Sequence, residues 1–319
     1  MRTDRSQRRA ASPGFDTTDG QVCRRSVSCA AMNSEAVVVE KVAVVGGGLM
    51  GTGIAESAAV AGIPVIVRDV DEPSIEHARA RIESSLARSV RSGKLDAAAA
   101  DEVRSRIVLT TELHAIATAD LVIEAVPEQR DLKLAVMSAI DSVIPERMVV
   151  ASNTSSIPIT ELAAALRLPE RVVGLHFFSP VPMMALVEIV VGLDTTSATV
   201  QAARTFAERI GKNVIETKDR SGFIVNRLLV PYLMSAVRMY EDGFATREDI
   251  DTGMKLGCGH PVGPLTLCDL VGLDVLYAVC DSLYDEFKRD EFAPPPLLKR
   301  MVASGRLGRK SGRGFYDYE

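Results

Sequence analysis

The chain has 319 residues and a net charge of −5, with 37 basic residues against 42 acidic ones, and nothing in this balance indicates a nucleic-acid surface. It is long enough for two domains, and no apolar run approaches the ~20 residues that span a bilayer. The five cysteines form no CxxC pair and are odd in number. We therefore expect no disulfide framework, no metal site and a reducing compartment such as the cytoplasm.

Residues 1–35 differ from the rest of the chain. They are rich in arginine, serine, threonine and glycine and lack apolar periodicity, so we expect a disordered, dispensable tail. An arginine-rich, serine-rich segment is also typical of a mitochondrial transit peptide. Asp4, Asp16 and Asp19 argue against that alternative, which would place the protein in the mitochondrial matrix if residues 1–31 were a targeting signal. Met32 is an alternative start.

The folded part is expected to begin with a strand, a glycine turn and a helix. Residues 37–45 form a β-branched run that predicts a buried strand. Gly46, Gly48 and Gly51 then fit the pattern G-x-G-x-x-G, and residues 50–61 have helical composition. In this context the glycines indicate a turn that lets the backbone approach a pyrophosphate at the start of the helix.

A second strand is predicted over residues 64–68, and it ends at Asp69. An acidic residue at this distance from the glycines is typical of the group that binds the adenosine ribose of NAD. Its carboxylate would repel the 2′-phosphate of NADP, although Arg68 beside it would accept that phosphate. The alternative for Asp69 is a helix N-cap.

The next segment predicts a helical hairpin inserted into a doubly wound sheet. Residues 72–106 read as two helices with a turn at 92–94, more than a simple crossover needs. Strands are predicted over residues 107–110, 121–126 and 148–152. Alternating strands and helices indicate a parallel sheet with its ligands beyond the carboxyl ends of the strands. The polar segment 152–156 follows one such strand and suits a carbonyl or hydroxyl substrate.

His176 and Glu188 lie in apolar surroundings twelve positions apart, with Pro180 and Pro182 between them. Prolines favour a turn that reverses the chain, so we expect two neighbouring extended segments with the histidine facing the glutamate. A carboxylate on one ring nitrogen fixes the tautomer and leaves the other nitrogen free to take a proton. The alternative is a structural pair in a core turn.

The remaining sequence is almost entirely helical after a junction at residues 219–222, which follows a predicted helix over 196–210 and a strand near 213–216. Residues 223–240 are apolar on most sides, which indicates a buried helix. We expect a second subunit to cover part of it, and so a homodimer. Asn226 is the polar exception, and a buried amide needs a partner such as a substrate carbonyl.

At this point the chain resembles the L-3-hydroxyacyl-CoA dehydrogenase family in its short form, over about residues 38–319. The resemblance implies a Rossmann-type doubly wound α/β sheet with an inserted helical hairpin, followed by an all-α C-terminal dimerisation domain. The domains would cover residues 36–219 and 220–319. The motifs that carry the resemblance are Val45–Gly51, Ile123–Glu128, Ser152–Ser156, His176–Glu188, Gly222–Arg227, Gly263–Asp274 and Gly312–Tyr316.

The resemblance implies NAD as cofactor, an acyl-CoA as substrate, and reversible oxidation of a (3S)-3-hydroxyacyl-CoA. His176 would be the base and Glu188 its partner, with Ser155 and Asn226 on the substrate oxygen. Ser85 matches a position that contacts coenzyme A. The positions that match cofactor contacts are Gly46, Gly48, Leu49, Met50, Gly51, Asp69, Glu128, Lys133, Ser155 and Lys310.

Some positions depart from the family pattern. Ala185 stands where many members have lysine, and Ser92 stands where some members have a lysine that contacts coenzyme A, so that contact is in doubt here. Two other functions remain open. One is a dehydrogenase of small sugar acids such as gulonate, in which the long hairpin would have no role. The other is a non-catalytic NAD-binding protein, and the joint presence of Ser155, His176, Glu188 and Asn226 argues against it.

Overall fold

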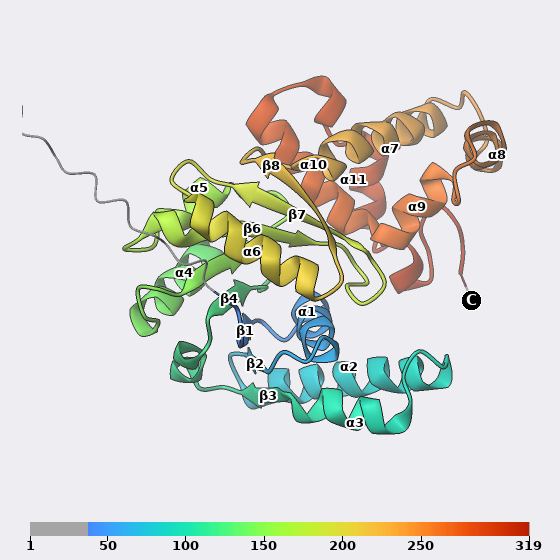
Figure 1. Cartoon of the computed structure of the whole chain (residues 1–319). Coiled ribbons are helices and arrows are strands. Elements are labelled where there is room, and N and C mark those ends of the chain that lie inside the picture. The colour runs from blue at the N-terminus through green and yellow to red at the C-terminus, as the bar shows by residue number, and fades with distance from the viewer. Residues whose placement is uncertain (1–37, 319) are drawn as a thin grey trace, which may run out of the picture. The chain divides into compact units, whose positions relative to one another are not determined.

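Figure 1 shows the computed structural model of the chain, which describes residues 38–318. The expectations for residues 1–35, for Met32 and for Val37 lie outside the described residues. Within the described part, no helix combines the length and the apolar character that crossing a bilayer requires.

The described chain contains an eight-stranded sheet in the order β3-β2-β1-β4-β5-β6-β7-β8. All neighbouring strands are parallel except β6 and β7, which are antiparallel. The doubly wound arrangement is as predicted, and the chain reversal falls at the two prolines. The strands are β1 Val42–Val45, β2 Val65–Arg68, β3 Ile107–Thr110, β4 Leu121–Glu124, β5 Val149–Ser152, β6 Val172–Phe177, β7 Leu186–Val191 and β8 Asn213–Lys218.

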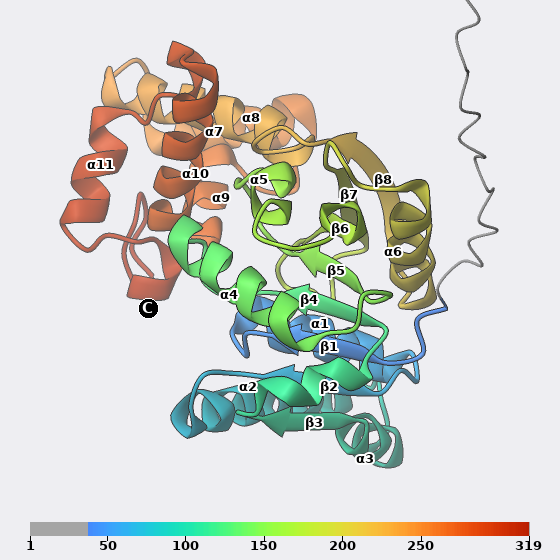
Figure 2. The same ribbon diagram turned by 90° about the vertical axis from the view of Figure 1, so that its left-hand side faces the viewer.

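Helices cover both faces of the sheet, and each face has its own apolar core (Figures 1 and 2). One core receives side chains from α1, α2, α3 and α6, including Ile54 and Phe206. The other receives them from α4 and α5, including Met137 and Leu162. The helices are α1 Leu49–Val60, α2 Glu72–Arg91, α3 Ala97–Ser105, α4 Arg130–Val143, α5 Ile159–Ala163 and α6 Ser197–Arg209.

The first strand is shorter than its sequence suggests. It begins at Val42 rather than in the preceding β-branched residues. The backbone N–H groups of Glu40 and Lys41 both donate to Oδ2 of Asp120, at 3.0 Å each, so a side chain takes the place of a neighbouring strand. The charged Glu40-Lys41 pair therefore precedes the first strand, although the sequence predicts a strand that includes it.

The helical hairpin forms as predicted, from α2 and α3. Asp71 caps α2 by accepting from Ser74 N at 2.8 Å, and Asp96 caps α3 by accepting from Ala99 N at 2.7 Å. The N-cap alternative for the acid at the end of β2 is therefore wrong, because Asp71 takes that role. Apolar side chains at helical spacing along α2, such as Ile82, pack the hairpin onto α1 and β3.

The last part of the chain forms a third apolar core from helices alone. Its helices are α7 Val225–Glu241, α8 Arg247–Cys258, α9 Pro264–Val271, α10 Leu273–Phe287 and α11 Pro296–Ala303. One side of α7 enters this core through Leu233 and Val237, whereas Leu228 is 72% exposed. Asp269 ties down the end of the chain by accepting from Phe315 N and Tyr316 N, at 2.9 Å each.

Candidate active site

The backbone is closely packed at Gly46 and Gly51, in the turn between β1 and α1 and at the start of α1. Gly46 has a φ of +110°, and a Cβ there would lie 2.6 Å from the Ala125 carbonyl oxygen. A Cβ on Gly51 would lie 1.8 Å from the Gly46 oxygen. A Cβ added to Gly48, in contrast, would meet no other part of the described chain within 4 Å. The turn is thus packed beneath and open above, as close approach of a ligand to the backbone requires.

The start of α1 is an open anion site. Gly48 is the N-cap and provides no side-chain acceptor, so the first N–H groups of the helix have no side-chain cap. These groups and the helix dipole favour a phosphate at this end. The residues present therefore fit the pyrophosphate of a dinucleotide.

A cavity of about 710 Å³ lies over this turn and extends across the carboxyl ends of β1, β2, β4 and β5. Asp69 lines it, and its Oδ2 accepts a hydrogen bond from Gly47 N at 2.7 Å. The carboxylate therefore sits at the turn, where its other oxygen faces Val70 N at 2.7 Å. Arg68 also lines the cavity, with Nε donating to Thr111 O at 3.3 Å. Other predicted cofactor positions on its lining are Gly46, Gly48, Leu49, Met50, Glu128 and Ser155.

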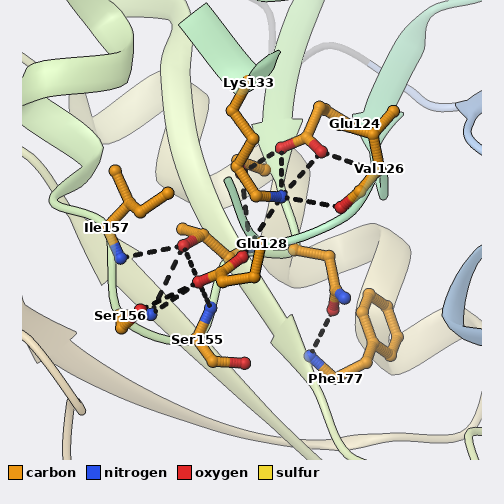
Figure 3. A network of polar contacts seen from close by, with 11 residues as sticks. Glu124, Val126, Glu128, Lys133, Ser155, Ser156, Ile157 and Phe177 are labelled. Atoms are coloured by element: carbon orange, nitrogen blue, oxygen red, sulfur yellow. Dashed lines mark hydrogen bonds and ion pairs between the residues drawn. The ribbon is translucent and has the colours of Figure 1, made fainter. Parts of the chain in front are cut away.

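Under this cavity lies a buried network of polar contacts, drawn in Figure 3. Glu124, the last residue of β4, is fully buried, and Lys133 on α4 is 1% exposed. Lys133 Nζ lies 2.7 and 2.9 Å from the two Glu124 oxygens and donates to Val126 O at 3.2 Å. Ser152 Oγ donates to Glu124 Oε2 at 2.6 Å. Every charge in this network thus has a partner, which burial of charges requires.

Lys133 also contacts Glu128, which holds the loop after β5 in place. Lys133 Nζ lies 3.3 Å from Glu128 Oε2. Glu128 Oε1 accepts from Thr154 Oγ1 at 2.6 Å and from the backbone N–H groups of Ser155 and Ser156, at 2.8 and 3.0 Å. Burial opposes ionisation of Glu128, but the Lys133 charge and these hydrogen bonds outweigh it, so the pKa of Glu128 lies below its ordinary value.

Glu128 thus holds the loop by its backbone and leaves the Ser155 hydroxyl uncommitted. In Figure 3 the Ser155 side-chain oxygen points away from Glu128. Within residues 38–318 it makes no hydrogen bond, and the residue lines the cavity. Asn153 of the same loop lines the cavity too, and its Oδ1 accepts from Phe177 N at 2.9 Å. This bond connects the cavity wall with the strand that carries His176.

His176 and Glu188 are direct partners in the register of β6 and β7. The predicted facing arrangement is therefore present, with His176 Nδ1 2.7 Å from Glu188 Oε2. The ring packs against Phe178 and Phe223, with centroids 4.6 and 5.3 Å away. Nε2 has no hydrogen-bond partner among the residues that the structure describes. The pair can therefore accept a proton at Nε2 while the carboxylate fixes the tautomer.

Glu188 also makes a second set of hydrogen bonds, which the sequence pattern does not indicate. Its Oε1 accepts from the backbone N–H groups of Ile224 and Val225, at 3.0 Å each. A carboxylate at a helix N-terminus satisfies unpaired donors and interacts favourably with the dipole. One carboxyl group thus orients His176 and caps α7, whose first turn carries Asn226. Asn226 is half-buried.

A second cavity of about 460 Å³ adjoins the first between α1, α2 and the loop after β6. Leu49, His77 and Arg81 line both cavities, and Ser85 lines the second. Glu56 lies on the same lining, and burial raises its pKa against the opposing effects of Ser85 and Arg88. This cavity is bordered by hydroxyl and basic groups of the predicted hairpin.

Three predicted cofactor positions lie elsewhere than on the cavity wall, and one of them, Gly51, is packed against Gly46 O beneath the turn. Lys133 is beneath the lining, in the network with Glu124. Lys310 pairs with Asp274, with Nζ 2.6 Å from Oδ1, and is not on the lining of either cavity. Its role at the cofactor stays a prediction. Glu124 and Asn153 are the residues that the sequence reasoning did not single out. A charged residue at the end of an apolar strand was the available signal for Glu124.

Among the described residues, no group of three histidine, cysteine or acidic side chains is placed to hold a metal ion. Of the other histidines, His260 lies 3.1 Å from the Tyr232 hydroxyl in the helical part. His77 lies on the cavity lining rather than in the core.

Comparison with known proteins gives one consistent result. Residues 41–220 match the family model of the 3-hydroxyacyl-CoA dehydrogenase NAD binding domain, and residues 222–318 match that of the 3-hydroxyacyl-CoA dehydrogenase C-terminal domain. The chain is 49% identical to a 3-hydroxybutyryl-CoA dehydrogenase of Mycobacterium tuberculosis over 88% of this chain and 99% of the relative. It is 42% identical to a mitochondrial hydroxyacyl-coenzyme A dehydrogenase of Sus scrofa over 92% and 96%.

Solved structures agree with these relatives. The crystal structure of M. tuberculosis FadB2 superimposes with a TM-score of 0.87 at 49% identity, over 88% of this chain and 100% of that one.

Proposed function

The chain belongs to the 3-hydroxyacyl-CoA dehydrogenase family, and we propose that it reversibly oxidises a (3S)-3-hydroxyacyl-CoA, such as 3-hydroxybutyryl-CoA, to the 3-oxoacyl-CoA. The cofactor is NAD, which the matched N-terminal domain binds. The observation that carries the proposal is the 2.7 Å contact between His176 Nδ1 and Glu188 Oε2, on a strand that is hydrogen-bonded through Phe177 N to Asn153 of the cavity wall.

In this mechanism His176 is the base. Its Nε2 takes the proton of the substrate hydroxyl as the C3–H bond breaks and the hydride leaves with both electrons. NAD, when bound, supplies the acceptor for that hydride. The substrate loses one proton and one hydride and becomes the ketone, and His176 becomes an imidazolium that Glu188 stabilises. Such general-base help is worth about 10²–10⁴ in rate.

Ser155 and Asn226 are proposed to hold the substrate oxygen. The Ser155 backbone is fixed by Glu128 at 2.8 Å, so its free hydroxyl is presented from a rigid loop. Asn226 lies on the first turn of α7, which Glu188 fixes through Ile224 and Val225. Rigidly placed donors stabilise an oxygen that gains charge in the transition state. Lys133 and Glu128 would support this loop and the nicotinamide ribose.

The adjoining cavity is the proposed site of the coenzyme A part of the substrate. It carries Ser85 together with Arg81 and Arg88 of α2. Hydroxyl and guanidinium groups suit the phosphates and amides of this group. A small sugar acid would leave the cavity empty, which favours the acyl-CoA over the gulonate-type alternative.

We also propose a homodimer built by the helical domain, residues 220–319. Leu228, Phe244 and Leu256 are 72%, 80% and 81% exposed in the single chain. Large apolar side chains that are this exposed on a helical domain are candidates for burial against a second subunit. Sedimentation analysis tests this: Leu228→Glu should shift the protein toward the monomer. Leu193→Glu, in the NAD-binding domain over residues 36–219, should not.

The proposed setting is fatty-acid oxidation or butanoate metabolism in the cytoplasm. In the described part of the chain, Cys258, Cys268 and Cys280 are free thiols, which suits a reducing compartment. The mitochondrial matrix is the alternative if residues 1–31 act as a targeting signal. N-terminal sequencing of the protein isolated from its own cells distinguishes a processed chain from an unprocessed one.

The experiment that tests the function is NADH oxidation with acetoacetyl-CoA and with longer 3-oxoacyl-CoA thioesters. Turnover that requires the thioester supports the proposal, and the series gives the acyl-chain preference. Turnover of a gulonate-type acid in its place would contradict it. NADH binding without turnover of any oxo substrate would instead support the non-catalytic alternative.

A further inference from the structure

Lys212 makes an unusual contact with the loop that joins the two catalytic strands. Residues 178–185 connect β6, which carries His176, with β7, which carries Glu188. Lys212 lies between α6 and β8, far from this loop in sequence. Its Nζ donates to Val181 O at 2.6 Å and to Met184 O at 2.9 Å. The next residue, Asn213, donates from its backbone N to Ala185 O at 2.6 Å.

The ammonium of Lys212 is buried without a counter-charge. The residue is 9% exposed, and no carboxylate pairs with it among residues 38–318. Burial lowers the pKa of Lys212 for this reason. A buried cation is costly unless its surroundings compensate it, and a neutral side chain of similar length would avoid the cost. The two loop carbonyls are therefore what the lysine is placed to bind.

The loop in turn forms one wall of the adjoining cavity. Val181 and Pro182 line it, as do Ser85 and Arg88 of α2. Val181 is packed tightly on α1, because a Cβ added to Gly53 would lie 2.9 Å from Val181 Cβ. A shift of the Val181 carbonyl would move this wall relative to α1 and α2. Lys212 is thus connected to the cavity through Val181. Its other partner, Met184, precedes the strand β7 that carries Glu188.

We propose that Lys212 is a positioning residue for the acyl-CoA substrate. It holds the loop 178–185 so that Val181 and Pro182 complete the cavity for the coenzyme A part, and it takes no part in proton or hydride transfer. This inference rests on the proposed function of that cavity. His176 and Glu188 are held by their own strands and by α7, so a change at Lys212 should affect substrate binding and not proton or hydride transfer.

The test compares Lys212→Met with the matched control Lys218→Met, which removes an exposed lysine at the end of β8. KM for acetoacetyl-CoA should rise by about tenfold, the equivalent of one weakened hydrogen-bonded contact. The KM for NADH and kcat should stay near the wild-type values. With S-acetoacetyl-N-acetylcysteamine, which lacks the nucleotide and most of the pantetheine, the two variants should behave alike.

Amide exchange provides a second readout. Met183 N and Met184 N both donate to Pro180 O within the loop, at 2.9 and 3.0 Å. Lys212→Met should accelerate exchange at these amides and leave the β6 amides protected, whereas a general loss of stability would accelerate both. Should Lys212→Met fail to fold, Lys212→Gln, which keeps a donor, should give a smaller rise in the same KM.

The outcomes separate the two proposals. If the wild-type protein does not turn over acetoacetyl-CoA, the proposed function fails. If it does, and Lys212→Met leaves KM for the thioester unchanged or lowers kcat equally for full and truncated substrates, the positioning role of Lys212 is wrong and the function stands.

Discussion

His176 and Glu188 occupy paired positions on β6 and β7, with Nδ1 of the histidine 2.7 Å from Oε2 of the glutamate. The other oxygen of Glu188 caps α7 through Ile224 and Val225. The carboxylate that orients the base therefore also joins the sheet to the helical part of the chain. One side chain thus contributes both to the chemistry and to the attachment of the helical part.

Glu188→Gln should impair both activity and stability. The amide would place a donor against either the ring nitrogen or the α7 N–H groups. We expect kcat to fall by about 10²–10⁴ because the base loses its orienting charge. Unfolding free energy should fall by about 1–3 kcal/mol from the unsatisfied buried groups. Kinetics and urea titration measure these effects. Glu216→Gln, on the exposed side of β8, is the control, and equal effects there would contradict the account.

Lys133→Met should destabilise the protein strongly. It would leave Glu124 fully buried without its cation, and the loss of one partner of a buried pair costs about 3–5 kcal/mol. Urea unfolding at neutral pH measures the change. Exposed Lys255→Met should be nearly neutral. Adding Glu124→Gln to Lys133→Met should restore part of the stability, and a double variant less stable than the single one would argue against the network.

Glu128 should contribute stability that depends on pH. Its pKa is lowered in the folded state from an ordinary value of 4.5, so the ionised form is the one that folding favours. The contribution is present above pH 4.5 and is lost as the pH falls through the lower folded pKa. Glu128→Gln should therefore lose stability at pH 7 and show a flatter decline in acid. Unfolding curves measured from pH 7 downward test this, and parallel declines would contradict it.

Asp69→Asn should weaken the binding of NADH. The carboxylate lines the cavity, where it would accept hydrogen bonds from the adenosine ribose, and a hydrogen bond to a charged group contributes about 1.5–3 kcal/mol. A rise of about tenfold or more in KM for NADH follows. KM for NADPH should change less or fall, because a repulsive charge is removed next to Arg68. Equal rises for both cofactors would mean that Asp69 acts on the turn alone and does not discriminate.

The sequence predicts the pairing of His176 with Glu188 well because local chemistry determines it. Two prolines reverse the chain, and a carboxylate in an apolar strand needs a partner. The glycine turn is predictable for a similar reason, since Gly46 and Gly51 have no room for a side chain. In each case a short stretch contains both the constraint and its cause.

Contacts between distant segments are not predictable in this way. Nothing in the sequence near Glu188 indicates that its second oxygen accepts hydrogen bonds from Ile224 and Val225, which follow it by 36 and 37 positions. The family resemblance places Lys133 at the cofactor, and only the fold shows that its ammonium is paired with the buried carboxylate of Glu124. The limit of β1 likewise depends on Asp120, a residue 80 positions after Glu40. These features arise from tertiary packing.

The central claim is that His176 is the base, and single-turnover hydride transfer from NADH to acetoacetyl-CoA tests it most directly. We predict that His176→Gln lowers this rate by about 10²–10⁴ while leaving the affinity for NADH, measured by fluorescence, unchanged. A His176→Gln protein that binds NADH and transfers hydride at the wild-type rate would contradict the account.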